Sequence, residues 1–324
     1  MPPQASRAAP EPMIRIKDLR VDYGDLTAVD DLGLEIQRGE IFGLIGPNGA
    51  GKTTTIKVLA TLLAPTYGEV TVGGIEVTTR PREVHRLLGY LPDWAPVSPG
   101  LRVWEFLHLY AGAYGIAPNL RHVAVDEALE TAELTSKVND LAGTLSRGMK
   151  QRLGLAKTLL HDPEVILLDE PASGLDPRAR IELRKVLKNL AVRGRTVLIS
   201  SHILTELEGF CTSLGIMERG RLVASGTLAD IISRVQADRT IVVTLLGSEE
   251  TRSRAREILG ASASVTRVEE RENGDLAVGF AGAEADKAAL LARLVGGQVP
   301  VTAFGEETLG VEDVFMKIGA KELA

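Results

Sequence analysis

The sequence predicts an α/β fold over about residues 13–235, followed by a smaller α+β unit over residues 236–324. Apolar runs typical of buried strands recur in the first part, at Ile41–Ile45, Val165–Leu168 and Thr196–Ser200, and segments of helical spacing follow them. The second part changes to a β-α-β-β-α-β order, which predicts a ferredoxin-like fold. A hydrophobic content of 44% over 324 residues suits globular cores in about two domains.

The stretch after the first of these strands fits G-x-x-x-x-G-K-[ST], the pattern of a phosphate-binding P-loop. Glycines let the backbone N–H groups converge on phosphates, with the positive end of a helix behind them. Lys52 is expected to place its charge on the β- and γ-phosphates, and the Thr53 hydroxyl to ligate Mg²⁺. An ordinary glycine turn is disfavoured, because three glycines, Lys-Thr and the right flanks occur together. The predicted nucleotide-binding residues of this loop are Gly46, Pro47, Asn48, Gly49, Ala50, Gly51, Lys52, Thr53 and Thr54.

Composition argues against several classes of protein. A net charge of −6 and a pI of about 5.6 disfavour general nucleic-acid binding, which usually leaves a basic footprint. A single cysteine, Cys211, excludes an intrachain disulfide and fits a reducing compartment. No apolar run reaches about 18 residues, so we expect no membrane span in this chain. Residues 1–12 are rich in Pro and Ala and are expected to form a disordered tail.

The residues around the P-loop predict further strands. Met13–Ile16 and Leu19–Val21 predict short edge strands, and Ala28–Ile36 alternates well enough for a longer strand. Tyr23 lies between Val21 and Ala28 and is a candidate for stacking on an adenine ring. The alternative for Tyr23 is an aromatic side chain filling the face of a hairpin, and the residues alone favour that alternative.

A helical insert is expected over about residues 94–150. Val103, Phe106, Leu107 and Tyr110 fall on one helical face, while Trp104 and His108 lie off that face and are expected to be exposed. Ser146 is well placed as the N-cap of a helix that runs to about Leu160. The N-terminus of that helix is therefore a candidate site for a second anion.

Two consecutive carboxylates, Asp169 and Glu170, end the apolar run Val165–Leu168. Burying such groups unpaired is costly, so they need an explanation. Where parallel strands run beside a P-loop, this end of a strand faces the phosphates. Asp169 would then hold Mg²⁺ through water, and Glu170 would be the base that orients the attacking water. The alternative is a solvated pair in a loop.

His202 follows the strand Thr196–Ser200 and also stands at a strand end. A histidine there would contact the γ-phosphate and distinguish ATP from ADP. The residues alone favour the alternative of a structural histidine.

These motifs together resemble the nucleotide-binding subunit of ATP-binding-cassette (ABC) transporters over about residues 13–235. The specific mark is their order: the P-loop, Leu145–Met149 in place of the family's LSGGQ signature, Asp169-Glu170, the Ser173–Asp176 loop, then His202. The resemblance implies that two cassettes sandwich two ATP molecules. Ser146 and Gly148 of one cassette would cap the γ-phosphate that is bound by Lys52 of the other.

The resemblance also implies roles for single residues. Tyr23 would stack on the adenine, and His202 would contact the γ-phosphate and act with Glu170 and Lys52 in catalysis. The metal ligands would be Thr53, Asp169 and Asp93, with ATP and Mg²⁺ as cofactors.

Two positions depart from the family's pattern. Asp93 stands where the family usually has Gln, and three roles are open to it: binding the metal directly, slowing hydrolysis, or only capping its loop. Arg147 and Met149 replace Gly and Gln of the signature, and Arg147 is open to contact with a phosphate, a partner's carboxylate or solvent.

The sequences of Gly89–Asp93 and of Leu145–Arg152 are similar to those of the type-2 exporter branch, which transports drugs, antibiotics, polysaccharides or lipids. This implies an ATP-hydrolysing exporter subunit that works as a homodimer with a separately encoded integral membrane permease. The chain would be peripheral, at the cytoplasmic face of the cell membrane, without a nucleic-acid partner.

Two other functions stand as alternatives. A soluble ABC ATPase acting on the ribosome or on nucleic acid is disfavoured by the single P-loop and the absence of sustained heptads. A binding-only regulatory cassette is disfavoured by the presence of Lys52, Asp169, Glu170 and His202.

Residues 236–324 carry no catalytic constellation, and we expect a regulatory or dimer-stabilising domain there. Its last predicted helix is Val311–Ile318, and Glu312–Phe315 resembles the ending of many ATPases of the exporter branch.

Overall fold

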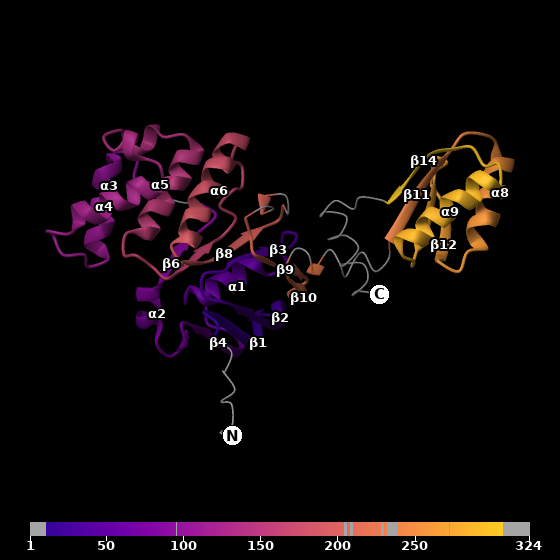
Figure 1. Cartoon of the computed structure of the whole chain (residues 1–324). Helices are drawn as coiled ribbons and strands as arrows, with labels where there is room; N and C mark the ends of the chain where they lie inside the picture. Colours follow the sequence, from indigo (N-terminus) through magenta and orange to yellow (C-terminus); the bar gives the residue numbers. More distant parts are fainter. Residues whose placement is uncertain are drawn as a thin grey trace, which may run out of the picture. The chain divides into compact units, whose positions relative to one another are not determined.

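The computed structural model describes residues 11–94, 96–203, 206–207, 210–227, 230–231, 239–271 and 273–306. The chain divides into two compact units, Met1–Leu228 and Ala229–Ala324, which we describe separately (Figure 1). Three expectations lie outside the described residues: most of the tail over residues 1–12, the domain boundary near residue 235, and the last helix with its Glu312–Phe315 segment.

The first unit contains helices and strands that cover most of its described residues. In chain order they are β1 (Ile14–Tyr23), β2 (Leu26–Ile36), β3 (Ile41–Ile45), α1 (Lys52–Leu59), β4 (Tyr67–Val72), β5 (Ile75–Glu76), α2 (Pro81–Leu87), β6 (Leu88–Leu91), α3 (Val103–Ala113), α4 (Arg121–Thr131), η1 (Thr135–Lys137), η2 (Ala142–Thr144), α5 (Arg147–Leu159), β7 (Val165–Leu168), α6 (Pro177–Val192), β8 (Thr196–Ser201), β9 (Ser213–Glu218) and β10 (Arg221–Gly226).

A six-stranded sheet of order β10-β9-β3-β8-β7-β6 forms the centre of this unit. Strands β9, β3, β8, β7 and β6 are parallel, and only the edge strand β10 is antiparallel. β3, β7 and β8 are buried at every position, as their continuous apolar runs predict for a sheet covered on both faces. Their carboxyl ends lie at the same edge of the sheet, which is where the P-loop, the two carboxylates and His202 emerge.

The second sheet is antiparallel and has the order β2-β1-β4-β5. The expectation of two short edge strands over residues 13–21 is wrong, because β1 is one continuous strand paired on both sides, with β2 and with β4. Asp18 interrupts its register with a φ of 51°, which explains why the polar residues Lys17 and Asp18 separate two apolar runs. α1 lies between the two sheets, and one core joins all three (Figure 1).

The predicted helical insert packs α3, α4 and α5 around a separate core that reaches from Val103 to Leu160. Trp104, with 40% of its surface exposed, and His108 lie outside this core, as predicted. Ser146 is the N-cap of α5, and its Oγ accepts a hydrogen bond from the Met149 N–H at 3.3 Å. The capping and the end of the helix near residue 160 are therefore confirmed.

The second unit has the predicted β-α-β-β-α-β order. Its elements are β11 (Arg239–Leu245), α8 (Glu249–Gly260), β12 (Val265–Glu270), β13 (Leu276–Phe280), α9 (Glu284–Gly296) and β14 (Val301–Glu306). The sheet order β12-β13-β11-β14 with antiparallel pairing throughout is that of a ferredoxin-like fold. The last strand begins at Val301, since Gln298 just before it has a φ of 60° and Pro300 lacks an N–H donor.

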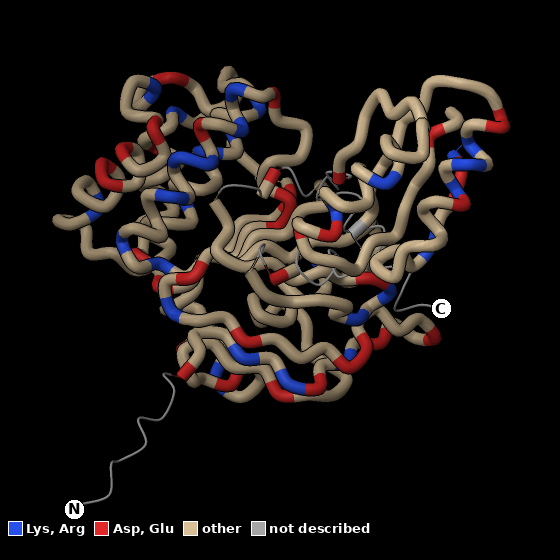
Figure 2. Tube along the Cα trace, turned by 45° about the vertical axis from the view of Figure 1, so that its right-hand side comes forward, with Lys and Arg blue, Asp and Glu red and all other residues tan. Residues whose placement is uncertain are grey.

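Basic and acidic residues are interspersed along both units (Figure 2). Among the described residues, none of the helices is long and apolar enough to span a membrane.

The fit between β9 and the P-loop strand gives a stability prediction. A Cβ on Gly215 would lie 2.8 Å from the ring of Phe42, which is buried and has no room to move. We expect Gly215→Ala to lower the free energy of unfolding of the first unit by roughly 1–3 kcal/mol through overpacking. The matched control is Gly33→Ala in β2, where a Cβ would meet nothing within 4 Å. Equal denaturant midpoints for the two variants would contradict this prediction.

Candidate functional site

The P-loop connects β3 to α1, and its glycines serve two different purposes. Gly49 and Gly51 have φ angles of 83° and 100°, which only glycine adopts readily. Gly46 has no such angle, but a Cβ there would overlap the carbonyl oxygen of Met217. Gly46 is thus required for close packing rather than for an unusual backbone angle.

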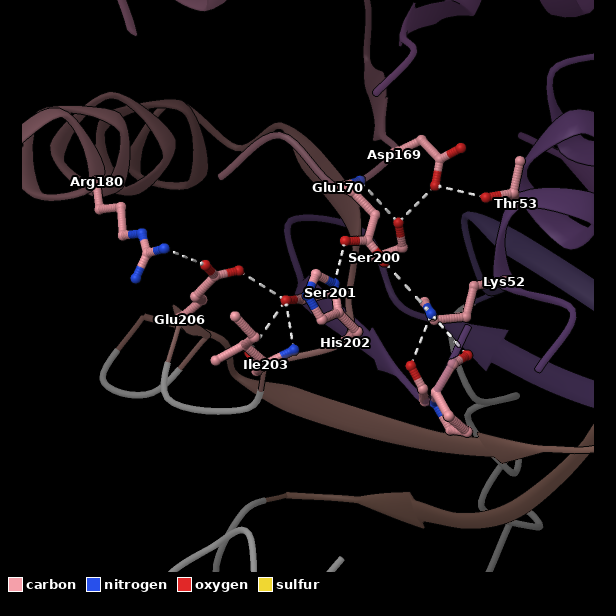
Figure 3. A network of polar contacts seen from close by, with 12 residues as sticks. Lys52, Thr53, Asp169, Glu170, Arg180, Ser200, Ser201, His202, Ile203 and Glu206 are labelled. Atoms are coloured by element: carbon pink, nitrogen blue, oxygen red, sulfur yellow. Dashed lines mark hydrogen bonds and ion pairs between the residues drawn. The ribbon is translucent and has the colours of Figure 1, made fainter. Parts of the chain in front are cut away.

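Lys52 is buried at the first position of α1, with 5% of its surface exposed. Its Nζ donates hydrogen bonds to the carbonyl oxygens of Gly46, at 2.7 Å, and Pro47, at 3.1 Å. It also lies 3.4 Å from Glu170 Oε1 (Figure 3). Lys52 therefore joins the P-loop directly to the carboxylate at the end of β7.

Asp169 is 98% buried, since only 2% of its surface is exposed, and two hydroxyl groups serve one of its oxygens. Thr53 Oγ1 donates to Asp169 Oδ1 at 3.1 Å, and Ser200 Oγ donates to the same atom at 2.7 Å (Figure 3). Burial raises the pKa of Asp169, the two hydroxyl groups oppose that rise, and the nearby carboxylates of Asp93 and Glu170 add to it. The ionised form of Asp169 is thus destabilised by its surroundings, and a cation bound beside it would stabilise it.

Glu170 lies between Lys52 and His202. Its Oε2 is hydrogen-bonded to His202 Nδ1, while its Oε1 faces the ammonium of Lys52 (Figure 3). Its backbone has a φ of 47°, an uncommon conformation for a residue with a side chain, and its N–H donates to Ser200 Oγ at 2.9 Å. Local strain of this kind at a strand end is typical of functional sites.

Ser200 is a site residue that the sequence analysis did not single out. Its hydroxyl group accepts from Glu170 N–H and donates to Asp169, so it orients both carboxylates. The signal that could have found it is a serine within an apolar run that must be buried, because a buried hydroxyl group needs partners.

Asp93 emerges beside these groups because β6 pairs in parallel with β7. It is exposed, and its Oδ1 accepts a hydrogen bond from Trp94 N–H at 2.8 Å, so it does cap its own loop. Its charge contributes to the raised pKa of Asp169. Together with burial and Asp169, it also raises the pKa of Tyr90 to about 12.

Tyr23, Ser146 and Gly148 lie apart from this network. Within the part of the chain that the structure describes, no hydrogen bond or ion pair joins them to Lys52 or Glu170. Tyr23 ends β1 with 47% of its surface exposed, and Ser146 is exposed at the start of α5. Gly148 is buried against α6, so closely that a Cβ on it would lie 2.7 Å from the Cβ of Ala179. One chain thus brings together the predicted P-loop, metal and catalytic residues, but not the predicted signature residues.

The residues present fit a nucleotide-borne Mg²⁺ ion. Mg²⁺ prefers octahedral oxygen ligands and is usually held by one or two carboxylates plus substrate phosphates and water. Thr53 and Asp169 supply a hydroxyl group and a carboxylate at one place. Among the described residues there is no group of three or more His, Cys, Asp or Glu that could hold a metal by itself, so an ion here would need the phosphates as ligands.

Comparison with known proteins agrees with this geometry. The model of the family described as ABC transporter matches residues 29–173. The Nod factor export ATP-binding protein I of Burkholderia lata is 34% identical over 311 residues, which are 96% of this chain and 98% of that protein. The chain belongs to the ABC transporter family. The linearmycin resistance ATP-binding protein LnrL of Bacillus subtilis is also 34% identical to this ABC protein, over 74% of this chain and 76% of the relative.

Solved ABC structures match the first unit. A structure of the ATP-binding subunit of an ABC transporter is 32% identical, with a TM-score of 0.62, and covers 69% of this chain and 93% of its own. A dimeric ATP-binding cassette bound to ADP and phosphate is 25% identical, with a TM-score of 0.60, over 67% and 99% of the two chains. This ABC protein is therefore an ATP-binding subunit and an ATPase, and the relatives offer no support for a ribosomal or nucleic-acid function.

The buried carboxylate of the ABC site leads to a stability prediction with a defined sign. Because the pKa of Asp169 is raised above 3.8 in the folded protein, its ionised form destabilises the fold above that raised pKa. We expect Asp169→Asn to melt at a higher temperature than the parent near neutral pH, without nucleotide and in EDTA, and to lose ATPase activity. The advantage should shrink as the pH falls through the raised pKa toward 3.8.

The matched control is Asp126→Asn on the exposed face of α4, which should leave the melting temperature unchanged at every pH. A lower melting temperature for Asp169→Asn near neutral pH would show instead that the hydrogen bonds from Thr53 and Ser200 to a charged acceptor outweigh the cost of burial.

Proposed function

We propose that this ABC ATPase powers export through a separately encoded membrane permease, at the cytoplasmic face of the membrane. One observation carries the catalytic assignment: the Glu170 carboxylate lies between Lys52 and His202, at the sheet edge that the P-loop also faces. The names of the relatives support export, since one exports Nod factor and another confers linearmycin resistance. The transported molecule would belong to the drug, antibiotic, polysaccharide or lipid classes, and the permease would select it.

Nucleotide binding is assigned to the P-loop residues 46–54 and to Tyr23. The backbone N–H groups and the N-terminus of α1 would bind the phosphates, and Tyr23 would stack on the adenine from the end of β1. Lys52 would exchange the carbonyl oxygens of Gly46 and Pro47 for the β- and γ-phosphates.

The metal site is assigned to Thr53, Asp169 and Asp93. Mg²⁺, brought with ATP, would neutralise charge that develops on the phosphates. Thr53 and Asp169 already share a hydrogen bond, so both are oriented toward one place. Asp93 adds a second carboxylate close enough for its charge to act on Asp169, which supports a role as a ligand or as a group that binds ligating water.

Hydrolysis is assigned to Glu170 as the base and His202 as its positioning partner. Glu170 would accept a proton from the attacking water through a carboxylate oxygen. His202 holds that carboxylate through Nδ1, which leaves Nε2 to contact the γ-phosphate. In a homodimer, Ser146 and Gly148 of the partner cassette would complete the site, since neither reaches Lys52 within one chain.

The base assignment predicts the behaviour of Glu170→Gln. We expect its ATP turnover to fall by roughly 100-fold or more, the scale of lost general-base catalysis. ATP affinity should persist, because the P-loop is unchanged, and ATP should accumulate in a stable dimer. The measurements are steady-state ATPase rate, nucleotide binding by equilibrium titration and mass by light scattering.

Glu130→Gln is the control for loss of one carboxylate, because Glu130 is exposed on α4 away from the site. Turnover in Glu170→Gln equal to that of the control would remove Glu170 from the role of base. Lack of turnover in the parent chain would count against the ATPase assignment itself or would point to a requirement for the permease.

The second unit is proposed to be a regulatory or dimer-stabilising domain. It has its own hydrophobic core, from Ile241 to Val299, so its folding does not depend on the core of the first unit. The relative from Burkholderia lata matches over 96% of this chain, a share that the first unit alone would not fill.

We therefore expect deletion of residues 236–324 to leave ATP binding intact and to weaken ATP-dependent dimerisation of the Glu170→Gln variant by about tenfold or more, which is about 1.4 kcal/mol. Analytical ultracentrifugation over a concentration series would measure this change. Unchanged dimerisation together with an unchanged ATPase rate in the otherwise unmodified chain would overturn the proposed role.

A further inference from the structure

A second charged network lies directly behind the catalytic residues and is centred on Glu206. Its side chain is 4% exposed. Ser201 Oγ donates to Glu206 Oε2 at 2.8 Å, and Arg180 lies 3.2 Å from Oε1 (Figure 3). Burying an ionised carboxylate is unfavourable unless such partners compensate it, so the position of Glu206 depends on Arg180 and Ser201.

Helix α6 holds the segment around Glu206 at more than one point. Arg180 binds the Glu206 carboxylate, and Arg184, one turn later, donates from Nε to the Glu206 carbonyl oxygen at 3.1 Å. The Arg184 guanidinium also lies over the ring of Phe210, at 5.9 Å from its centroid. Glu206 and Phe210 are thus both in contact with the first two turns of α6.

Ser201 carries this attachment into the site. It is 2% exposed and stands between Ser200, which orients Asp169 and Glu170, and His202, which holds the Glu170 carboxylate. Besides its bond to Glu206, its Oγ accepts a hydrogen bond from Ile203 N–H at 3.0 Å. Ser201 on one side of His202 and Ile203 on the other are therefore joined through one hydroxyl group, which lies 2.8 Å from Glu206 Oε2 and 3.0 Å from the Ile203 carbonyl oxygen.

The same helix begins where the loop that leaves Glu170 ends. Asp176 is the N-cap of α6, its Oδ1 accepting from Ala179 N–H at 2.8 Å, and Arg180 N–H donates to the Asp176 carbonyl at 3.1 Å. Pro171 and Ala172, which directly follow Glu170, line the same small cavity as Arg180 and Glu206. A shift of α6 would therefore act on the chain after Glu170 and on the chain around His202 together.

We propose that Arg180 and Glu206 are positioning residues of the ATPase, a role that rests on the functions proposed above for Glu170 and His202. Their ion pair fixes the position of the Ser201 hydroxyl group. Through Ser201 it fixes the angle at which the His202 ring meets the Glu170 carboxylate. Because Arg180 belongs to α6, movement of the loop over residues 171–176 changes the contact between His202 and Glu170. Neither residue touches the nucleotide.

The test compares Glu206→Gln and Arg180→Gln, alone and combined, in the full chain. Each single variant lowers kcat by roughly tenfold, the lower end of what loss of an outer-shell partner costs at metal sites, while the KM for ATP stays within about twofold. The double variant is no slower than the slower single variant, because the two residues act as one unit. Ser201→Ala, which leaves the ion pair in place, shows the same loss of kcat.

The matched control is Arg178→Gln, which removes a cation from the same turn of α6 at an 88% exposed side chain. Its kcat stays at the parent value. Melting temperatures are measured for all variants, and Ser201→Ala, which keeps the ion pair between Arg180 and the 4% exposed Glu206, remains informative if either charge variant fails to fold.

A spectroscopic readout separates positioning from a general loss of stability. The chain has five histidines, so ¹⁵N-imidazole signals can be resolved and His202 identified with His202→Gln. The His202 signal shifts in Arg180→Gln and Glu206→Gln but not in Arg178→Gln. An unshifted His202 signal overturns the proposal, whether kcat falls or not. If the variants shift the His202 signal but the parent chain hydrolyses no ATP, the proposed catalytic function is overturned instead. The structural link between Arg180, Glu206 and His202 then remains in place.

Discussion

The site depends on one constraint: two consecutive carboxylates end a strand that is buried at every position. Asp169 and Glu170 stand at the end of β7, where water cannot solvate them fully. Each neighbouring element therefore supplies a partner, with Thr53 and Lys52 from α1 and Ser200 and His202 from the end of β8. The parallel register brings these partners to one edge. Stabilising the carboxylates and preparing the chemistry are thus one arrangement, in which burial still raises the pKa of Asp169 against the opposing hydroxyl groups.

Much of this could be predicted from the sequence, because the relevant signals are local. The P-loop, the apolar strands, the carboxylate pair and the N-cap at Ser146 are each defined within a few residues. What could not be predicted depends on contacts between distant segments. The need for glycine at position 46 arises from the Met217 carbonyl, the role of Ser200 from its place beside β7, and the interior position of β1 from pairing with β4. Polar and apolar patterns within a segment do not encode such pairings.

Family membership explains what kind of ATPase this chain is, and the geometry of the site explains how its residues are arranged for that activity. Similarity over 96% of the chain to an export ATP-binding protein establishes an ABC ATPase, and the site then shows how this chain arranges the parts. Helix α6 is the element that links those parts, since its N-cap ends the loop after Glu170 and its first turns hold the chain after His202. A transporter must convert a change at a phosphate into movement. This requires an element with two positions, one favoured before hydrolysis and the other after it. Helix α6 is placed to take part in such a movement, because it is attached to the site at two points.

The contacts of Lys52 bear on how nucleotide affinity should be understood. Its ammonium is already satisfied by two carbonyl oxygens of its own loop and faces the Glu170 carboxylate. Arrival of a triphosphate is therefore an exchange of partners, in which the favourable new contacts are offset by those given up. The same internal bonds hold the loop in shape beforehand, so little ordering is left to do at the moment of binding. Nucleotide affinity at this loop is therefore set by the balance between the partners that Lys52 exchanges and the ordering that is already complete before binding.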